Sequence, residues 1–182
     1  MEGARLVEED ILRMSEISFM INDYQDIFSS FDPRPYSERA LSVDFLDEAK
    51  RASVDKEFGN IQLRLIVSKK KKSESIENII KQRLHEHFKK HHEILHKEAG
   101  KVMKRGACFT IAGVFIMFLA AYILFKNHQT LLISFLIILL EPAGWFLFWE
   151  GLGQIVFESK KKKPELDFYH KMAKSKIEFI AY

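Results

Sequence analysis

ACFTIAGVFIMFLAAYILF, residues 107–125, and LLISFLIILLEPAGWFLFW, residues 131–149, are two apolar blocks that only the sequence KNHQT separates. Each block is close to the ~20 residues that a helix needs to cross about 30 Å of hydrocarbon at about 1.5 Å per residue. Neither block contains Lys or Arg, and the short connection forces the two segments to run antiparallel. The two blocks therefore predict a transmembrane hairpin of two helices.

A buried hairpin inside a soluble protein is the alternative. That fold requires other apolar segments around the two helices, and the rest of the 182-residue chain is not apolar enough to supply them. We therefore expect a multi-pass integral membrane protein with one small domain outside the bilayer.

The basic residues are concentrated on one side of the predicted hairpin. Between Lys69 and Arg105 there are twelve Lys or Arg against five Glu, and a second basic run covers Lys160–Lys163. The connection between the blocks carries a single Lys. This asymmetry predicts a plasma (inner) membrane protein with both termini in the cytoplasm. Anionic lipid accounts for basic charge beside a membrane, so the expected partner is the lipid bilayer and not nucleic acid.

Two segments outside the blocks show the alternation of a β-strand. Asn60–Ser68 and Lys176–Tyr182 place apolar residues at every second position. An isolated strand is unstable, so we expect both segments in one sheet, with a third strand near Arg39–Leu41. Ile17–Ile21 is a further short strand candidate, and a helix is predicted from Ser42 to about Ala52.

Such a sheet joins the end of the chain to its beginning and splits the soluble domain around the membrane segment. The predicted fold class is an α+β membrane protein: an antiparallel two-helix transmembrane hairpin, a long cytoplasmic helix and a small split αβ domain. Its predicted parts are the N-terminal portion of the cytoplasmic domain at 1–72, a basic stalk helix at 73–106, the hairpin at 107–157, and a returning helix and strand at 158–182.

The predicted stalk helix carries an apolar stripe with helical spacing. The stripe consists of Ile76, Ile80, Leu84, Phe88, His91, Leu95, Ala99 and Val102. It requires a partner, which can be the sheet, the C-terminal helix or the same helix of another subunit.

The stalk also contains histidines at the i, i+4 spacing that can clamp a metal ion from one helical face. The candidate ligands are His87, His91, His92 and His96. Lys and Arg crowd both faces of this helix and work against cation binding, so we expect a solvated or packed helix face and no metal or cofactor. Metal binding and pH sensing stay open as alternatives.

Glu141 and Pro142 place a carboxylate and a proline near the middle of the second block. Pro142 cannot donate a helical hydrogen bond and suits the first position of a new helix, so we predict a helix kinked or broken at Glu141. A carboxylate at this depth costs at least about 3 kcal/mol unless it is neutral or finds water, backbone or another subunit. Two interpretations stay open: a structural role at the kink, and an ion or proton pathway that includes Glu141, Pro142 and Gly144.

Small residues on both blocks suggest close helix contact. Gly106 and Gly113 are seven residues apart, as are Gly144 and Gly151. Two helices alone bury little membrane surface, so we expect a homo-oligomer. The predicted interface anchors, aromatic or basic, are Trp145, Trp149, Lys104, Arg105, Lys160 and Lys161.

The sequence contains no nucleophile–base arrangement, no Gly-rich phosphate loop and no CxxC motif. We therefore expect a protein that is not an enzyme. Its single cysteine, Cys108, cannot form an internal disulfide, and we expect it to fill a small buried position.

Several short motifs resemble those of a family of small, uncharacterised prokaryotic membrane proteins with two transmembrane helices. The matching segments are Phe28–Pro33 with Arg39-Ala40-Leu41, Ile61–Val67, His87-Phe88, and Gly144-Trp145 with Trp149. The resemblance implies a hairpin with a cytoplasmic αβ domain and supplies no catalytic residues. The additional histidines and the Glu141-Pro142 pair depart from its pattern.

Two functions remain for such a chain. The first is a non-enzymatic, homo-oligomeric scaffold whose cytoplasmic domain recruits a protein partner. The second is an oligomeric ion channel or pore component that uses Glu141. A metal-responsive stalk is a third possibility.

Overall fold

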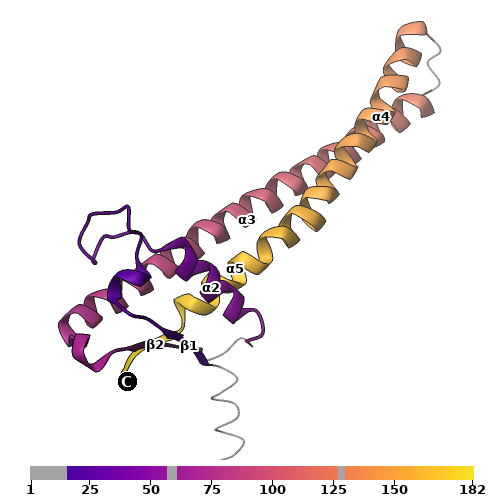
Figure 1. The fold of residues 1–182 in the computed structure, drawn as a ribbon. Helices are drawn as coiled ribbons and strands as arrows, with labels where there is room; N and C mark the ends of the chain where they lie inside the picture. The colour runs from indigo at the N-terminus through magenta and orange to yellow at the C-terminus, as the bar shows by residue number, and fades with distance from the viewer. Residues whose placement is uncertain (1–15, 57–60, 127–129) are drawn as a thin grey trace, which may run out of the picture. The chain divides into compact units, whose positions relative to one another are not determined.

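A computed structural model describes residues 16–56, 61–126 and 130–182 of the chain, which is mostly helical with a small parallel sheet (Figure 1). The strands are β1 (Glu16–Met20), β2 (Gln62–Val67) and β3 (Lys176–Ala181). The helices are α2 (Val43–Ser53), α3 (Glu74–Phe125), α4 (Leu131–Gly153) and α5 (Ser159–Ala173), with 3-10 turns η1 (Tyr24–Ile27) and η2 (Lys69–Lys71) and a π-helical segment η3 (Gln154–Glu158).

The chain divides into two compact units. The sheet unit comprises Met1–Glu93 and Glu165–Tyr182, and the two-helix unit comprises Ile94–Pro164. The sheet unit is thus built from both ends of the sequence, and α3 contributes residues to both units.

All three strands of the sheet are parallel, in the order β1-β2-β3. Ile17, Leu63 and Ile177 share one register position across the sheet. Parallel neighbours require a crossover connection. The connection from β2 to β3 consists of η2, α3, α4, η3 and α5, so both long apolar helices lie within one crossover of the sheet.

The third strand of the sheet is β1 and not the segment near Arg39–Leu41. In that segment, Leu41 forms only an isolated antiparallel bridge with Phe28. The backbone of Ala40 donates a 2.7 Å hydrogen bond to the carboxylate of Asp32, which holds this segment in a loop. The prediction of a strand there is therefore wrong, whereas the Ile17–Ile21 candidate closely matches β1.

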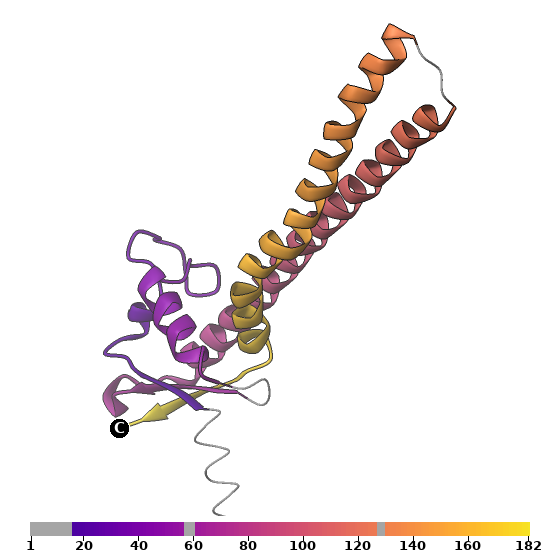
Figure 2. The same ribbon diagram turned by 90° about the vertical axis from the view of Figure 1, so that its right-hand side faces the viewer.

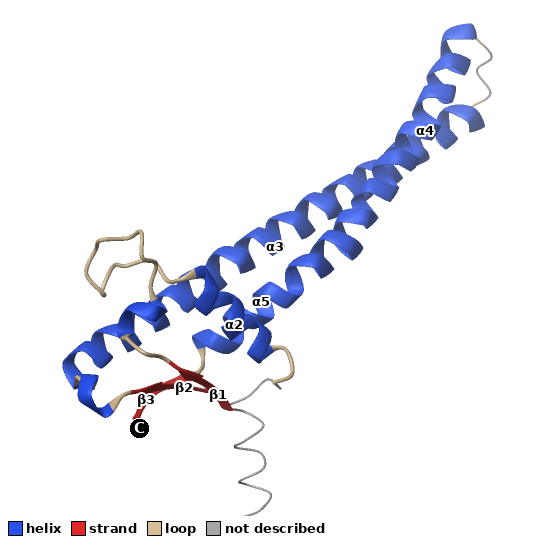
Figure 3. Ribbon diagram, in the orientation of Figure 1, coloured by secondary structure: helices blue, strands red, loops and turns tan. Residues whose placement is uncertain are grey.

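One face of the sheet is covered by helices, which lie together on that side of the strands (Figure 3). Leu63, Leu65 and Val67 of β2 point into this core and are fully buried. Ring contacts join the layers: Phe19 of β1 lies 5.9 Å from Phe45 of α2, centroid to centroid.

The predicted stripe of α3 is confirmed where the helix belongs to the sheet unit. Ile80, Leu84 and Phe88 are fully buried. The ring centroid of Phe88 lies 6.0 Å from that of Phe168, so the C-terminal helix α5 is one partner of the stripe.

Helix α2 begins at Val43, close to its predicted start. Its buried residues are Phe45, Ala49 and Ser53, whereas Val43 is exposed. The side chain of Ser42, at the N-cap position, makes no capping hydrogen bond.

Helix α4 is a single α-helix that contains Pro142 in its interior. Of the two predicted alternatives, a break at Glu141 is therefore wrong, and a kink there stays a prediction. The π-helical segment η3 follows α4, and α5 continues from it without an intervening loop (Figure 2).

Candidate functional site

The backbones of α3 and α4 approach one another at glycines within the two-helix unit. A Cβ atom built at Gly113 would lie 2.5 Å from the amide nitrogen of Phe148 and 2.7 Å from the carbonyl oxygen of Gly144. Contact distances this short leave no room for any side chain. Gly113 and Gly144 therefore permit close helix packing.

A second glycine pair repeats this contact two turns away. A Cβ atom at Gly151 would lie 2.5 Å from the amide nitrogen of Thr110 and 2.6 Å from the carbonyl oxygen of Gly106. The hydroxyl of Thr110 donates a 2.9 Å hydrogen bond to that same carbonyl oxygen. The glycines of both blocks thus serve close helix contact within one chain.

The outward faces of these two helices are covered with large apolar side chains. Among the most exposed are Phe115, Phe118, Leu124, Leu131, Leu132, Phe135, Ile138 and Phe146. Only 11% of the apolar window of α3 and 6% of the corresponding window of α4 is buried. Both helices are long and apolar enough to cross a membrane.

Glu141 is exposed on α4, three residues before the buried Gly144. Its helical neighbours Ile138 and Trp145 are exposed with it, whereas Gly144 is buried. No hydrogen bond or ion pair links its carboxylate to another residue in the part of the chain that the structure describes. Pro142 is likewise exposed, so of the three predicted pathway residues only Gly144 faces the helix partner.

The predicted interface anchors are exposed side chains. Trp145 and Trp149 stack with centroids 6.3 Å apart and planes at 19°. The guanidinium of Arg105 lies over the ring of Phe109 at 5.4 Å, and its neighbour Lys104 is exposed. Long amphipathic side chains of this kind suit a boundary between an apolar and an aqueous medium.

The returning helix carries the other two anchors, which are exposed as well. Lys161 pairs with Glu158 at 2.7 Å, and Lys160 precedes it. Lys162 pairs with Glu98 of α3 at 2.7 Å, so the two basic segments are joined by an ion pair within the two-helix unit.

Cys108 is exposed, which contradicts the expectation of a small buried position. It lines a shallow apolar groove of about 590 Å³ on α3, together with Ile111 and Phe115. The sequence could not distinguish this outward position because apolar residues surround the helix on all sides.

Three histidines of α3 in the sheet unit, His87, His91 and His92, contact other rings. His87 and His91 have ring centroids 4.2 Å apart, and Tyr169 of α5 stacks on His91 at 5.2 Å with planes at 17°. His92 faces His170 of α5, with Nε2 and Nδ1 3.1 Å apart. A packed helix face, one of the sequence-based interpretations, describes these three residues.

Metal binding receives no support from this arrangement. Across residues 16–56, 61–126 and 130–182, no group of three or more His, Cys, Asp or Glu side chains is placed to hold a metal ion. His96, the fourth candidate ligand, is exposed and belongs to the two-helix unit.

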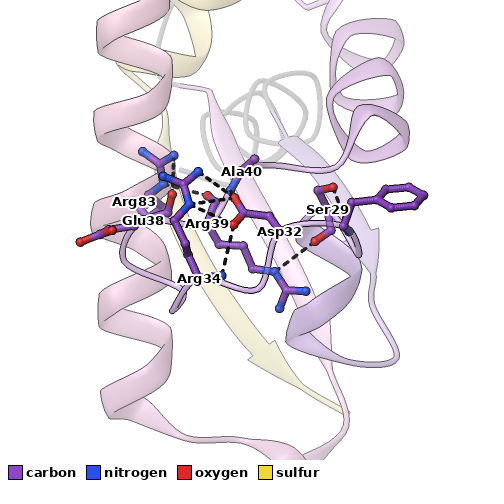
Figure 4. A network of polar contacts seen from close by, with 8 residues as sticks. Ser29, Asp32, Arg34, Glu38, Arg39, Ala40 and Arg83 are labelled. Atoms are coloured by element: carbon purple, nitrogen blue, oxygen red, sulfur yellow. Dashed lines mark hydrogen bonds and ion pairs between the residues drawn. The ribbon is translucent and has the colours of Figure 1, made fainter.

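The loop between η1 and α2 is held by a network of polar contacts (Figure 4). Asp32 accepts hydrogen bonds from the guanidinium of Arg34 at 2.8 and 2.9 Å and from the backbone of Ala40. Arg83 of α3 donates to the carbonyl oxygens of Arg39 and Glu38 at 3.0 and 3.4 Å. The Arg34 guanidinium holds the pKa of Asp32 well below its usual range, and the Ala40 amide adds to this.

This network presents one aromatic side chain to solvent. Phe31 is 96% exposed, while Phe28 is buried and packs on Tyr36 with centroids 5.1 Å apart. The anchoring role of Arg83 left no local signal because its partners lie more than 40 residues earlier in the chain.

Comparison of the chain with protein-family models, curated proteins and solved structures gave no match. The resemblance to a family of two-helix membrane proteins therefore stays an expectation.

Proposed function

We propose that this chain is an integral membrane protein. Its helices α3 and α4 cross the membrane as an antiparallel hairpin, and both termini lie in the cytoplasm. The observation that carries this proposal is the exposure of their apolar side chains: 11% and 6% of the two apolar windows is buried. The core helices of a soluble protein are mostly buried, so lipid is the solvent that fits these surfaces.

The orientation follows from charge. Lys104 and Arg105 of α3 and the run at 160–163 lie at the same ends of the two apolar segments, where the cytoplasmic surface favours cations. The test is labelling of single cysteines in a Cys108→Ser background with a membrane-impermeant maleimide applied to intact spheroplasts. We expect Lys126→Cys to be labelled and Tyr182→Cys to be protected until the membrane is opened. Labelling of Tyr182→Cys in intact spheroplasts contradicts the proposed topology.

The membrane form is a homo-oligomer in which the Glu141 face of α4 meets another copy. In a monomer, this exposed carboxyl group meets hydrocarbon, at a cost of at least about 3 kcal/mol. The glycines of α3 and α4 are already occupied by their mutual contact, whereas the exposed Glu141 of α4 is available for a second copy.

Association is measured by energy transfer between labelled chains in liposomes as the ratio of protein to lipid falls. We expect Glu141→Leu to weaken association at least about tenfold, and Glu141→Gln to preserve it because the amide still hydrogen-bonds. Glu150→Leu is the matched control, since this exposed glutamate lies at the end of α4. Wild-type chains that stay monomeric at every ratio overturn the proposal.

The cytoplasmic part serves as a scaffold that recruits a protein partner and is not an enzyme. The support is the exposed Phe31 on a loop that hydrogen bonds to Asp32 and Arg83 hold, because a segment held in this way loses less conformational entropy on binding. The measurement is binding of partners found by proximity labelling to the purified chain, with Phe31→Ser compared against wild type. Equal affinities for every such partner contradict a role for this loop.

A channel or pore component that uses Glu141 is the second candidate. An ionisable side chain within an apolar span is the feature that favours it. Conductance in planar bilayers tests it, with Glu141→Gln as the variant expected to lose cation current. A purified oligomer that is silent across voltage and pH removes this candidate and leaves the scaffold.

A further inference from the structure

Three rings join α3 to α5 inside the sheet unit. His87 and His91 lie one turn apart on α3, and Tyr169 of α5 lies 6.3 Å from His87 and 5.2 Å from His91, centroid to centroid. Phe88 lies 6.3 Å from the same tyrosine on the buried side. The Nε2 atom of His87 is buried without a hydrogen-bond partner among the described residues. A protonated imidazole at this position would bury a charged N–H group in the same way, which is costly.

A second imidazole contact lies beside the first. His92 Nε2 and His170 Nδ1 are 3.1 Å apart and partly buried. A hydrogen bond between two imidazoles requires one N–H donor and one unprotonated nitrogen. When both rings carry a proton on these atoms, two donors and two positive charges face one another, and the contact is lost.

We propose that these two contacts form an acid-sensitive clamp between α3 and α5, closed while the imidazoles are neutral and opened by their protonation below about pH 6.5. The proposal is independent of the membrane assembly described above. It assigns the histidine-rich segment to regulation.

The charges around the first contact favour the neutral form of its rings. Burial, together with the neighbouring His91, Arg83 and Lys90, lowers the pKa of His87 to about 4. Burial also lowers the pKa of His91, with Lys90 acting in the same direction and Glu165 of α5 opposing. From α2, Asp47 acts on Tyr169, whose pKa is raised mainly by burial.

The pKa shift at the second contact, between His92 and His170, has the same direction for His170. Burial lowers the pKa of His170, and Lys174 and His92 add to this effect, while Asp167 opposes it. The pKa values of His87, His91 and His170 are all lowered, so the closed clamp binds fewer protons than the open one. By linkage, the closed form is fully favoured above the ordinary histidine pKa and weakens as the pH falls below it.

Opening would expose a buried apolar surface. Phe168 and Met172 of α5 are buried beside the clamp, and α5 leads directly into β3. Release of α5 from α3 therefore uncovers these two side chains for a partner or for lipid.

The test is amide hydrogen exchange of peptides covering 165–173 in the full chain, reconstituted in lipid nanodiscs and corrected for the intrinsic pH dependence of exchange. A group with pKa 6.5 when released and about 4 when packed predicts a roughly tenfold loss of protection between about pH 7.5 and pH 5.5 from His87 alone. A change of less than about twofold in wild-type protection overturns the proposal.

The matched variants are His87→Phe with His91→Phe, and His85→Gln as the control on the exposed side of α3. The phenylalanine rings keep the stack with Tyr169 but cannot be protonated, so the acid-induced loss should shrink to a few-fold. The control should behave as wild type. A double variant that loses protection as fully as wild type contradicts the clamp.

An NMR titration of the wild-type histidines gives a measurement that needs no variant with altered packing. A ring assigned to His87 that titrates below about pH 5 supports the clamp, and one that titrates above about pH 6 overturns it.

Discussion

The phenylalanines of α3 differ in solvent exposure between the two units of this protein. Phe88, in the sheet unit, is 0% exposed, whereas Phe118, in the two-helix unit, is 72% exposed. The sheet unit surrounds its apolar side chains with other parts of the chain. The two-helix unit presents them outward, and its helices are long and apolar enough to cross a membrane. Burial in this protein therefore has to be judged by unit.

The largest expected effect separates these two phenylalanines. Phe88→Ala leaves a cavity in the core between α3 and α5 and should lower the free energy of unfolding by about 3–5 kcal/mol. Phe118→Ala should lower it by less than about 1 kcal/mol in nanodiscs, because its neighbour there is fluid lipid that refills the space. Thermal or denaturant unfolding followed by circular dichroism provides the measurement. Equal losses would mean that both regions are packed alike.

The glycines test the inner surface of the two-helix unit. A Cβ atom at Gly113 would lie 2.5 Å from the amide nitrogen of Phe148, so Gly113→Ala must separate the helices and should destabilise by about 3 kcal/mol.

Gly100→Ala is the control for this glycine, because nothing lies within 4 Å of its Cβ position. It should stabilise α3 by about 0.5–1 kcal/mol, the intrinsic helix preference of alanine over glycine. A neutral Gly113→Ala would indicate that the close helix contact is not maintained in lipid.

Buried polar contacts should matter in the sheet unit alone. The hydroxyl of Tyr24 donates a 2.9 Å hydrogen bond to Glu77, which is 4% exposed, and accepts one from the backbone of Ser73 at 3.0 Å. Tyr24→Phe leaves both groups without this partner and should destabilise by roughly 2 kcal/mol. Tyr182→Phe, at an exposed position, should change stability by less than about 0.5 kcal/mol.

Acid should weaken the sheet unit slightly through its ion pairs. The hydroxyl of Ser18 and then the guanidinium of Arg64 lower the pKa of Glu16, whose carboxylate lies 2.6 Å from Arg64. A lowered carboxyl pKa contributes stability above its ordinary value of 4.5, which is lost as the pH falls below it. The contribution should be less than about 1 kcal/mol, and Glu16→Gln should remove it from the acid limb of the stability profile. An unchanged acid limb contradicts the assignment.

Much of the secondary structure was predictable because its signals are local. The alternation at residues 61–67 and 176–181 identified β2 and β3, and the three-and-four spacing at Ile80, Leu84 and Phe88 identified the buried face of α3. The third strand was misplaced because strand pairing is a contact between distant residues, and the Arg39–Leu41 segment is instead held by hydrogen bonds to Asp32 and Arg83.

The residues of the candidate site were predictable from the sequence, but the direction in which each side chain faces was not. Sequence indicated a carboxylate in an apolar span and glycines on both helices. It could not say that Gly113 and Gly144 face each other while Glu141 stays exposed, because both helices are apolar around most of their circumference and show no preferred side. The same lack of a preferred side led to the wrong expectation for Cys108.

Length and hydrophobicity along the chain were thus enough to define two membrane-length helices, a basic flank and the strands of a small domain. The close glycine contact, the exposed position of Glu141 and the stacking of His91 on Tyr169 depended on tertiary structure. Each of these features joins residues that are 31 to 78 positions apart or sets which way a side chain points, and both are properties of packing. The local sequence pattern indicates whether a segment prefers an apolar or an aqueous environment. Which residue a side chain contacts is decided only by the packing of segments against one another.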